Sequence, residues 1–398
     1  MSGDGLGLEE LLAAAEDAAP CESVDVVARN LEERYGACDV SFVFVDLVGQ
    51  QVVRLPRAGP AGEPVEKAER LRLPGSRYER VLQNQQLLQE ETEGGVRLVA
   101  PVTNRGDCIG VLELVVANGD ETVRKAVARA AHALAYIVVT DRRFTDLYHW
   151  GRRTTHTRLA AEIQHQLLPS ASCCEAAQFT LACALVPADR VGGDTYDYSL
   201  DQDMLHLSIT DAMGHDTDSA LLATLTVNAL RQARRAHAGL LGQAHAADQA
   251  LTRYDRGLTT GQLLRIALDT GQCQLVNAGH PWPLLLRDGH VRELPLAVNR
   301  PFGIPAPADY ETQSLPLAPR DRLVLLTDGM QERGSAVVDL PALLEHTADE
   351  HPREVVRALI DAVREANQNE LPDDATVMVL DWHGSTSSRR HTDAGSNT

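Results

Sequence analysis

Several aspartates in the C-terminal half of the chain lie at the ends of apolar segments that are typical of buried strands. Asp211 and Asp328 each directly follow such a segment. Asp373 and Asp374 directly precede another, and Asp194 stands in a Gly-Gly turn before a further one. Carboxylates gathered at one end of a sheet repel one another, and they stay ionised together only where a cation compensates them. The pattern therefore predicts a sheet-rich domain with a cation site at the ends of its strands.

The ligand type indicates which cation and which chemistry. Carboxylate oxygens without paired His or Cys favour hard cations, Mg²⁺ or Mn²⁺, over zinc or copper. Two such ions that share a carboxylate can lower the pKa of a bound water and neutralise a phosphoryl group during in-line attack. Taken singly, each aspartate is also typical of a turn or a helix cap. The set as a whole predicts metal-assisted hydrolysis of phosphate esters.

Charge and composition exclude several other classes of protein. Asp and Glu number 56 and Lys and Arg 37, which gives a net charge of −19. This balance disfavours binding to nucleic acid or to an anionic membrane surface, since both need an excess of basic side chains. No apolar run reaches the ~18 residues that span a bilayer, and no signal peptide is evident. The seven cysteines include no Cys-x-x-Cys pair. We expect reduced thiols and a cytoplasmic protein.

Residues 1–140 are expected to form one domain with an antiparallel sheet flanked by helices. Helical spacing near both 8–12 and 24–31 precedes the sheet, and a further helix starts near Glu121. Asn104–Asp107 is typical of a hairpin turn between the last two strands. The strand-like runs are Val40–Val45, Gln51–Leu55, Val96–Val102 and Cys108–Val116.

A helical stretch over about 121–168 is expected to join the two halves of the chain. Its apolar stripe lapses over 151–157 and resumes until Pro169, which ends it. We define 141–172 as a helical connector. The stripe either packs on its own domains or pairs with a second copy, and we expect a homodimer formed through the connector.

Residues 173–383 are dense in strand signals and are expected to form a sandwich of sheets covered by helices. Two turns, Asp269–Gly271 and Asp288–Gly289, indicate hairpins. The expected helices span about 219–237, 340–346 and 353–367. The tail, 384–398, has no apolar periodicity and is expected to be disordered.

Seven motifs occur in a family's order across residues 161–376. They are Ala161–Pro169, Val186–Asp197, Thr210–His215, Asn277–Pro281, Pro301–Gly303, Leu326–Gly329 and Asp373–Thr376. In these stretches the chain resembles the metal-dependent PPM (type 2C) Ser/Thr protein phosphatases, in the bacterial branch typified by SpoIIE. The resemblance implies an α+β fold, in which two antiparallel sheets form an αββα sandwich.

The resemblance also implies a site with two ions, Mn²⁺ or Mg²⁺. By motif position Asp211 bridges both ions, and the Ala212 carbonyl joins one of them. Asp194 acts on that ion directly or through water. Asp328 and Asp373 hold the other ion. The implied catalytic set is therefore Asp211, Asp194 and Asp328, while Asp374 has a supporting role.

The implied reaction is hydrolysis of phosphoserine or phosphothreonine by direct attack of a metal-bound hydroxide, without a phospho-enzyme. The implied partner is a phosphorylated anti-sigma-factor antagonist of the STAS type, with no nucleic acid and no membrane. An effector-gated enzyme or an inactive phosphatase-like scaffold that binds a phosphoprotein is the alternative. The sequence departs from the family at Asp216, which replaces a Gly, and at Trp282, which replaces a Pro. His280 is expected to be structural, while the role of His215 stays open.

Residues 1–140 resemble a GAF domain through weaker motifs. These are the strand pair near 40–55, Leu98–Val102 and Ile109–Leu114, followed by a long helix. Such domains act as sensors or only dimerise, and no ligand is indicated here.

Overall fold

The computed structural model describes residues 7–46, 51–55, 68–148, 159–188, 192–214, 216–255, 257–305, 309–331 and 337–387. The chain divides into two compact units, one within residues 1–156 and one within residues 157–391. The boundary falls inside the predicted connector 141–172, so that the helix that precedes Pro169 belongs to the second unit. Each unit is described separately below.

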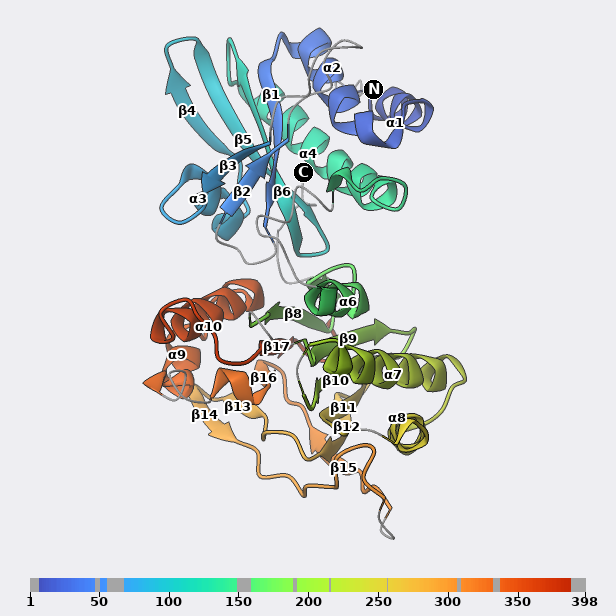
Figure 1. The fold of residues 1–398 in the computed structure, drawn as a ribbon. Helices are drawn as coiled ribbons and strands as arrows, with labels where there is room; N and C mark the ends of the chain where they lie inside the picture. The colour runs from blue at the N-terminus through green and yellow to red at the C-terminus, as the bar shows by residue number, and fades with distance from the viewer. Residues whose placement is uncertain are drawn as a thin grey trace. The chain divides into compact units, whose positions relative to one another are not determined.

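In the first unit, six described strands form one antiparallel sheet in the order β3-β2-β1-β6-β5-β4 (Figure 1). The strands are β1 (Cys38–Val45), β2 (Gln51–Arg54), β3 (Glu69–Arg72), β4 (Leu88–Thr92), β5 (Gly95–Asn104) and β6 (Asp107–Val116). The helices are α1 (Leu8–Asp17), η1 (Pro20–Glu22), α2 (Ser23–Tyr35), α3 (Arg77–Asn84) and α4 (Glu121–Asp141). The main apolar core lies between the sheet and helices α1, α2 and α4, and a smaller one lies beneath α3. An antiparallel sheet flanked by helices is confirmed.

The β5–β6 hairpin forms at the predicted turn. Arg105 and Gly106 have φ angles of 47° and 83°, as a two-residue turn between twisted strands requires. Asn104 and Asp107 face each other as the last pair of the ladder.

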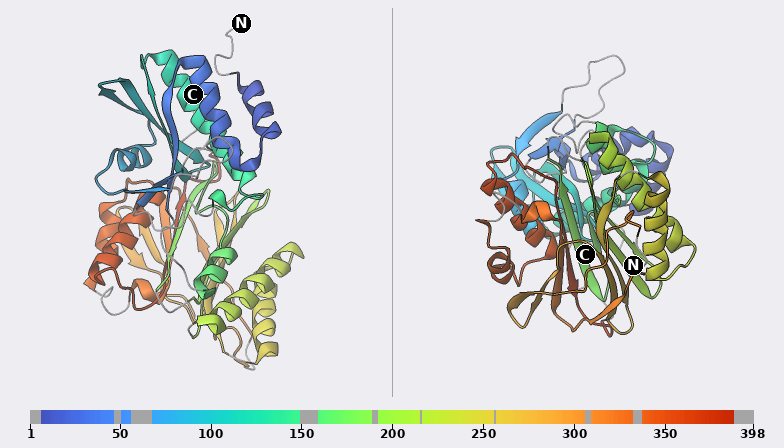
Figure 2. Two further views of the ribbon diagram at one scale, coloured as in Figure 1. Left: turned by 45° about the horizontal axis from the view of Figure 1, so that its top comes forward. Right: turned by 60° about the horizontal axis from the view of Figure 1, so that its bottom comes forward.

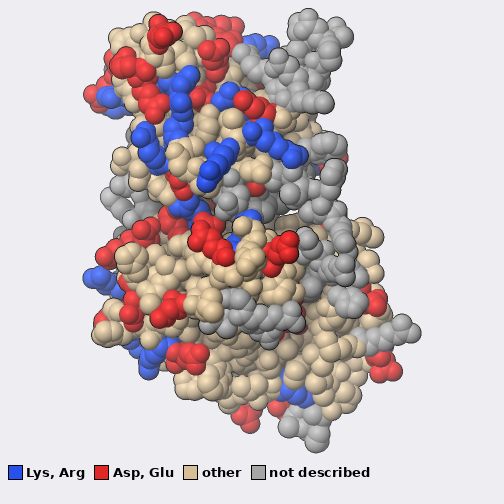
Figure 3. Space-filling view, turned by 60° about the vertical axis from the view of Figure 1, so that its left-hand side comes forward, with Lys and Arg blue, Asp and Glu red and all other residues tan. Residues whose placement is uncertain are grey.

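Charged side chains on the sheet of the first unit are largely paired. Arg54 donates to Glu113 (2.6 Å) and to the Tyr78 hydroxyl (2.8 Å), and that hydroxyl donates to Glu113 (2.8 Å). Arg77 forms an ion pair with Glu90 at 2.9 Å. On the face in Figure 3, Lys and Arg side chains of this unit accordingly lie among Asp and Glu side chains.

The apolar stripe predicted one continuous helix over 121–168, and this prediction is wrong. Helix α4 ends at Asp141, and Phe144 donates its backbone N–H to the Asp141 carbonyl in a tight last turn (2.9 Å). Val138, Val139 and Thr140 are β-branched, which weakens the end of the helix. Helical structure is described again in α6 (Leu159–Leu167), while the lapse at 151–157 lies outside the described residues.

The second unit is a four-layer sandwich, so the predicted αββα architecture is confirmed (Figures 1 and 2). One described sheet has the strand order β15-β12-β11-β10-β9, and the other has the order β14-β13-β16-β17-β8-β7. The core between the two sheets is apolar and includes the fully buried Phe179 and Trp382. The strands are β7 (Cys173–Glu175), β8 (Phe179–Val186), β9 (Asp194–Leu200), β10 (Met204–Ala212), β11 (Thr259–Ala267), β12 (Gln272–Ala278), β13 (Leu284–Arg287), β14 (His290–Glu293), β15 (Gln313–Pro316), β16 (Asp321–Leu326) and β17 (Ala375–Trp382).

Helices cover the outer face of each sheet. Helices α7 and α8 pack on the sheet that contains β10, and α6 packs on α7. Helices α9 and α10 pack on the sheet that contains β16 and β17. The bounds are α7 (Asp216–Arg235), α8 (Leu240–Tyr254), η2 (Asp328–Met330), α9 (Leu340–His346) and α10 (Pro352–Ala366). Both predicted hairpins form, at Asp269–Gly271 and Asp288–Gly289.

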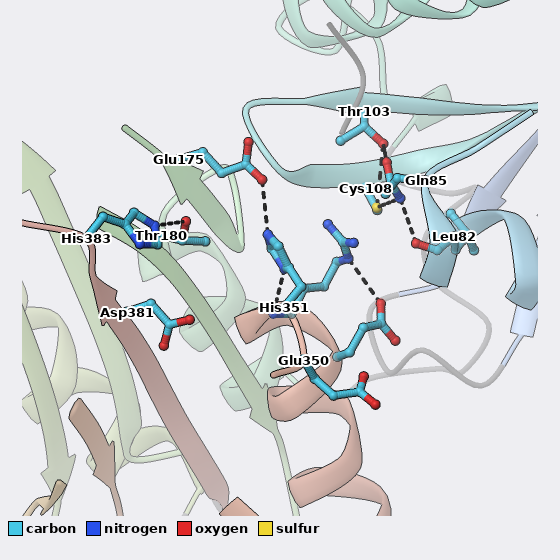
Figure 4. A network of polar contacts seen from close by, with 12 residues as sticks. Leu82, Gln85, Thr103, Cys108, Glu175, Thr180, Glu350, His351, Asp381 and His383 are labelled. Carbon is cyan, nitrogen blue, oxygen red and sulfur yellow. Dashed lines mark hydrogen bonds and ion pairs between the residues drawn. The ribbon is translucent and has the colours of Figure 1, made fainter. Parts of the chain in front are cut away.

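A hydrogen bond between His351 and Glu175 attaches α10 to the edge of its sheet. His351 caps the helix, because its Nδ1 accepts the Arg353 backbone N–H (3.1 Å). Its Nε2 therefore carries the proton and lies 3.0 Å from Glu175 of β7, whose side chain is buried (Figure 4). The pair fixes the position of α10 on its sheet.

Three further predictions concern the chain as a whole. Among the described residues, no helix is long and apolar enough to cross a bilayer. No disulfide joins any of the seven cysteines, all of which the structure describes. Disorder was predicted for 384–398, and the residues from 388 onward lie outside the described ones.

Candidate active site

The pairing of strands brings the predicted acidic residues to one end of the sandwich. In one sheet, Asp194 at the start of β9 pairs directly with Asp211 near the end of β10. In the other, β16 and β17 are antiparallel, so Asp328 after β16 lies at the same end as Asp373 and Asp374 before β17. Both sheets thus present carboxylates at the same edge.

Asp194 connects the two sheets. Its side chain is buried, and Oδ2 accepts hydrogen bonds from the Thr327 hydroxyl (2.7 Å) and the Thr376 hydroxyl (2.6 Å) of the opposite sheet. Two hydroxyl donors fix the orientation of the carboxylate. Both hydroxyls donate to Oδ2, and neither donates to Oδ1.

Burial and neighbouring carboxylates raise the pKa of Asp194 well above its ordinary value. Burial is the largest cause, followed by the negative charges of Asp211 and then Asp374. The hydroxyls of Thr327 and Thr376 act in the opposite direction, because they stabilise the ionised form. A cation beside Asp194 and Asp211 would relieve the same repulsion.

Asp374 is held by backbone and side-chain donors rather than exposed to solvent. Its carboxylate accepts the Ala188 N–H (2.8 Å), the Gln164 amide (2.6 Å) and, at 3.4 Å, the Asp194 N–H. Burial is the main reason why the pKa of Asp374 is raised to about 6. Gln164 comes from α6 and also donates to the Asp194 carbonyl (2.7 Å), so one helix residue supports both aspartates.

Two glycines allow the backbones at this end to approach closely. A Cβ on Gly193 would clash with the Ala212 carbonyl oxygen, and a Cβ on Gly329 would clash with the Asp374 carbonyl oxygen. The glycines beside Asp194 and Asp328 are therefore explained by the lack of space for a side chain. Because Gly193 and Gly329 have no side chain, Asp194 can lie beside Ala212, and Asp328 can lie beside Asp374.

A pocket of 390 Å³ opens at the same end of the sandwich. Asp211 and Asp328 both line it, one from each sheet. Asp373 is half-buried, and its Oδ1 accepts the Asp374 N–H (2.8 Å). The other lining residues are Thr260, Gly279, His280, Pro281, Trp282 and Val298.

The chemical type of the donor atoms at this site fits a hard divalent cation. The carboxylates and the Ala212 carbonyl supply only oxygen, and burial together with the charges of Asp211 and Asp374 raises the pKa of Asp194. Within the described part of the chain, no three Asp, Glu, His or Cys side chains already converge on one point as a metal site does.

Comparison with known families covers the part of this site that contains Asp211, Asp328 and Asp373. Residues 201–383 match the family model described as Stage II sporulation protein E (SpoIIE). They form a SpoIIE-type domain. The resemblance predicted from the seven motifs is confirmed for this domain, while the GAF-like assignment of the first unit stays a prediction.

Individual relatives of the SpoIIE-type domain are distant. The phosphoserine phosphatase RsbP of Bacillus subtilis (strain 168) is 28% identical over 173 residues, which are 40% of this chain and 41% of the relative. The chain thus matches about two fifths of the length of that relative. The SiaA PP2C domain of Pseudomonas aeruginosa is 22% identical, with a TM-score of 0.48, and the match covers 56% of this chain and 94% of that one. The phosphatase domain of SpoIIE from Bacillus subtilis is 21% identical, with a TM-score of 0.46, and covers 52% of this chain and 65% of that one.

Sequence reasoning missed three residues that hold the site of the SpoIIE-type domain together. Thr327, Thr376 and Gln164 all stand inside the motifs, but nothing in their spacing indicated which carboxylate they contact. Their polar side chains in otherwise apolar strands, and on the buried side of α6, were the only signal.

The two histidines of the motifs are placed differently. His280 is buried, and its Nδ1 lies 2.9 Å from the Thr260 hydroxyl. Burial lowers its pKa to about 3. His215 and the side chain of Asp216 lie outside the described residues.

Proposed function

We propose that this chain is a metal-dependent phosphatase that hydrolyses phosphoserine or phosphothreonine in proteins. The observation that carries the proposal is the meeting of Asp194 and Asp211 with Asp328 and Asp373 at one end of a SpoIIE-type domain. The activity in the name of RsbP, a phosphoserine phosphatase, agrees with this proposal.

Each site residue has a proposed role. Asp211 would help to hold two ions, Mn²⁺ or Mg²⁺, and the Ala212 carbonyl and Asp194 would help to hold one of them. Asp328 and Asp373 would hold the other ion. When bound, such ions supply an activated water and neutralise phosphoryl charge.

The remaining residues position these ligands. Thr327 and Thr376 hold the Asp194 carboxylate in one orientation through their hydroxyls. The Gln164 amide and the Ala188 N–H hold the Asp374 carboxylate in place by donating hydrogen bonds to it. The chain itself thus fixes the geometry, and the pocket admits a phosphorylated side chain to Asp211 and Asp328.

The proposed substrate is a phosphorylated anti-sigma-factor antagonist of the STAS type, in the cytoplasm. Dephosphorylation would then regulate transcription indirectly, by partner switching. The support is the family resemblance of the SpoIIE-type domain and the net charge of −19, which disfavours nucleic-acid partners.

Regulation is proposed to come from the first unit, acting as a GAF-like sensor in a homodimer. Tyr136 on α4 and Phe144 just beyond it are 48% and 70% exposed, which supports an apolar contact with a second copy. Within the second unit, Gln164 supports coupling of α6 to the site, because a shift of this helix would release donors from Asp374 and Asp194.

The test of the proposed function is phosphate release from phosphoserine and phosphotyrosine peptides with added Mn²⁺. We expect metal-dependent release from phosphoserine, and a loss of at least about 100-fold in Asp211→Asn, since one carboxylate contributes to both ions. Asp269→Asn is the matched control, because Asp269 is an exposed aspartate at the opposite end of the same sheet. Equal activity of Asp211→Asn and the control would refute the proposal.

A second candidate is an enzyme gated by an effector, or a scaffold that binds a phosphoprotein without hydrolysing it. The observation that favours gating is Gln164 of α6, which donates to both the Asp194 carbonyl and the Asp374 carboxylate. Phosphate release that begins only after a candidate phosphoprotein or effector is added would identify the gated enzyme. Binding without release would identify the scaffold.

A further inference from the structure

The turn between β12 and β13 is rigid. The Asn277 side chain accepts the His280 N–H (2.8 Å) and donates to the His280 carbonyl (2.9 Å). Gln262 of the neighbouring strand donates to the Pro281 carbonyl (2.5 Å). Gly279 has a φ of 73°, so the turn takes a conformation that favours glycine. The residue that follows, Trp282, therefore stands on a fixed support.

A second fixed segment lies beside this turn. The Trp282 indole donates to the Leu296 carbonyl (3.2 Å). The backbone N–H of Ala297 donates to Gln313 (2.7 Å), and that of Asn299 donates to the Asn277 carbonyl (2.8 Å). The residues on either side of Val298, Ala297 and Asn299, are thus held by backbone hydrogen bonds, and these fix the position of Val298.

Despite this support, both apolar side chains face solvent. Trp282 is 41% exposed and Val298 is 57% exposed. Both line the pocket that also contains Asp211 and Asp328. Exposed apolar residues on a rigid frame beside a reactive site are typical of binding surfaces, because little conformational entropy is lost when a ligand covers them.

We propose that Trp282 and Val298 form an apolar wall that binds a leucine-like side chain next to the phosphorylated serine of the protein substrate. The inference rests on the proposed function, because the phosphoserine at Asp211 and Asp328 places its neighbouring residues in the rest of the same pocket. The wall selects which phosphorylated segments are hydrolysed.

The chemistry of the pocket favours an apolar neighbour over an acidic one. The pocket lining contains no Lys or Arg among the described residues, so an acidic neighbour finds no positive partner there. Besides the two aspartates, the titratable residue that lines the pocket among the described residues is His280, and it is buried. A leucine side chain that covers the indole ring, by contrast, buries apolar surface, which makes binding more favourable.

The activity test uses three phosphoserine peptides that differ only in the residues flanking the serine, which are Leu, Asp or Arg. In the full-length chain with Mn²⁺, we expect kcat/KM for the Leu peptide to exceed that for the other two by about tenfold. Trp282→Ala should reduce this preference to less than about twofold, and Trp282→Phe should retain most of it. Leu241→Ala, which removes an exposed apolar side chain of α8, is the control and should keep the full preference.

A binding test gives a readout that does not depend on turnover. Fluorescein-labelled peptides with a non-hydrolysable phosphonate in place of the phosphate are titrated with each variant, and anisotropy is measured. The Leu peptide should bind the native chain about tenfold more tightly than the Asp peptide, and Trp282→Ala should abolish the difference. Equal affinities in the native chain, a preference for Arg, or an unchanged preference in Trp282→Ala would overturn the inference. A Trp282-dependent preference without phosphate release from any peptide would support the wall and contradict the proposed function.

Discussion

At the scale of single residues, the environment of Asp194 shows how the protein holds negative charge at one point. The carboxylate is buried and lies opposite Asp211, which raises its pKa. Two threonine hydroxyls from the other sheet offset part of this cost by donating to Oδ2. Burial of a carboxylate is otherwise strongly unfavourable, and the proposed cation beside Asp194 and Asp211 would reduce this cost.

His280 gives a prediction of pH-dependent stability. Its pKa in the folded chain is about 3, well below the ordinary value of 6.5, because it is buried. As the pH falls below 6.5, the unfolded chain binds a proton that the folded chain does not, so stability is lost progressively down to about pH 3. Between pH 7 and pH 5 this loss should be about 2 kcal/mol.

The measurement is denaturant unfolding at pH 7 and pH 5, followed by the fluorescence of buried Trp382. The change in the free energy of unfolding between the two pH values should be smaller in His280→Asn than in the native chain by that amount. His290→Gln, at an exposed position, is the control. An equal pH dependence in the native chain and His280→Asn would contradict the prediction.

Residue types and order were enough to predict which acidic positions gather, but not what supports them. The motif aspartates are recognisable because each adjoins a glycine or a strand end. The contacts of Thr327, Thr376 and Gln164 depend on how two sheets and a helix meet, which no local spacing encodes. The role of each aspartate toward a metal remains a proposal.

At the scale of elements, α6 is the helix that reaches the acidic residues. Gln164 is fully buried and donates to both the Asp194 carbonyl and the Asp374 carboxylate. In Gln164→Ala both acceptors lose this donor, and a buried acceptor without a partner costs about 1–3 kcal/mol. We expect a loss of that size in the stability of the second unit and at least about tenfold lower Mn²⁺-dependent turnover.

The control for this prediction is on the same helix. Gln166 is exposed and contacts Glu162 rather than the site, so Gln166→Ala should change stability by less than about 0.5 kcal/mol. Unfolding by denaturant and steady-state phosphate release are measured for both variants. Similar values for the two variants would show that Gln164 does not support the site.

Elements with a strong pattern were predictable, and those set by tertiary context were not. The hairpins at Asn104–Asp107 and Asp288–Gly289 followed from turn residues that tolerate positive φ. Strand β3 was missed, because its sequence Glu-Arg-Leu-Arg is mostly charged and exposed. Helix α8 was missed as well, since its buried side has Gln243, Ala244 and Ala247 between two leucines and gives a weak apolar stripe. The long helix was predicted from periodicity alone, which does not indicate where a helix ends.

At the scale of the whole molecule, the predicted site lies entirely within the second unit. A fragment of residues 157–398 should therefore fold and hydrolyse an aryl phosphate with Mn²⁺. Because the exposed Tyr136 and Phe144 are absent from it, the fragment should be monomeric, whereas the full chain should be a dimer. Light scattering after size exclusion, with activity assays of both forms, checks the prediction. An inactive folded fragment, or a dimeric one, would contradict it.

The proposed metal centre is tested most directly by phosphate release from a phosphoserine protein as the Mn²⁺ concentration is raised, in the native chain and in Asp328→Asn. We expect saturable, Mn²⁺-dependent release that the substitution reduces by at least about 100-fold, while the protein stays folded. Release that does not depend on Mn²⁺, or that is equal in Asp328→Asn, would contradict the claim that these carboxylates form the catalytic metal centre.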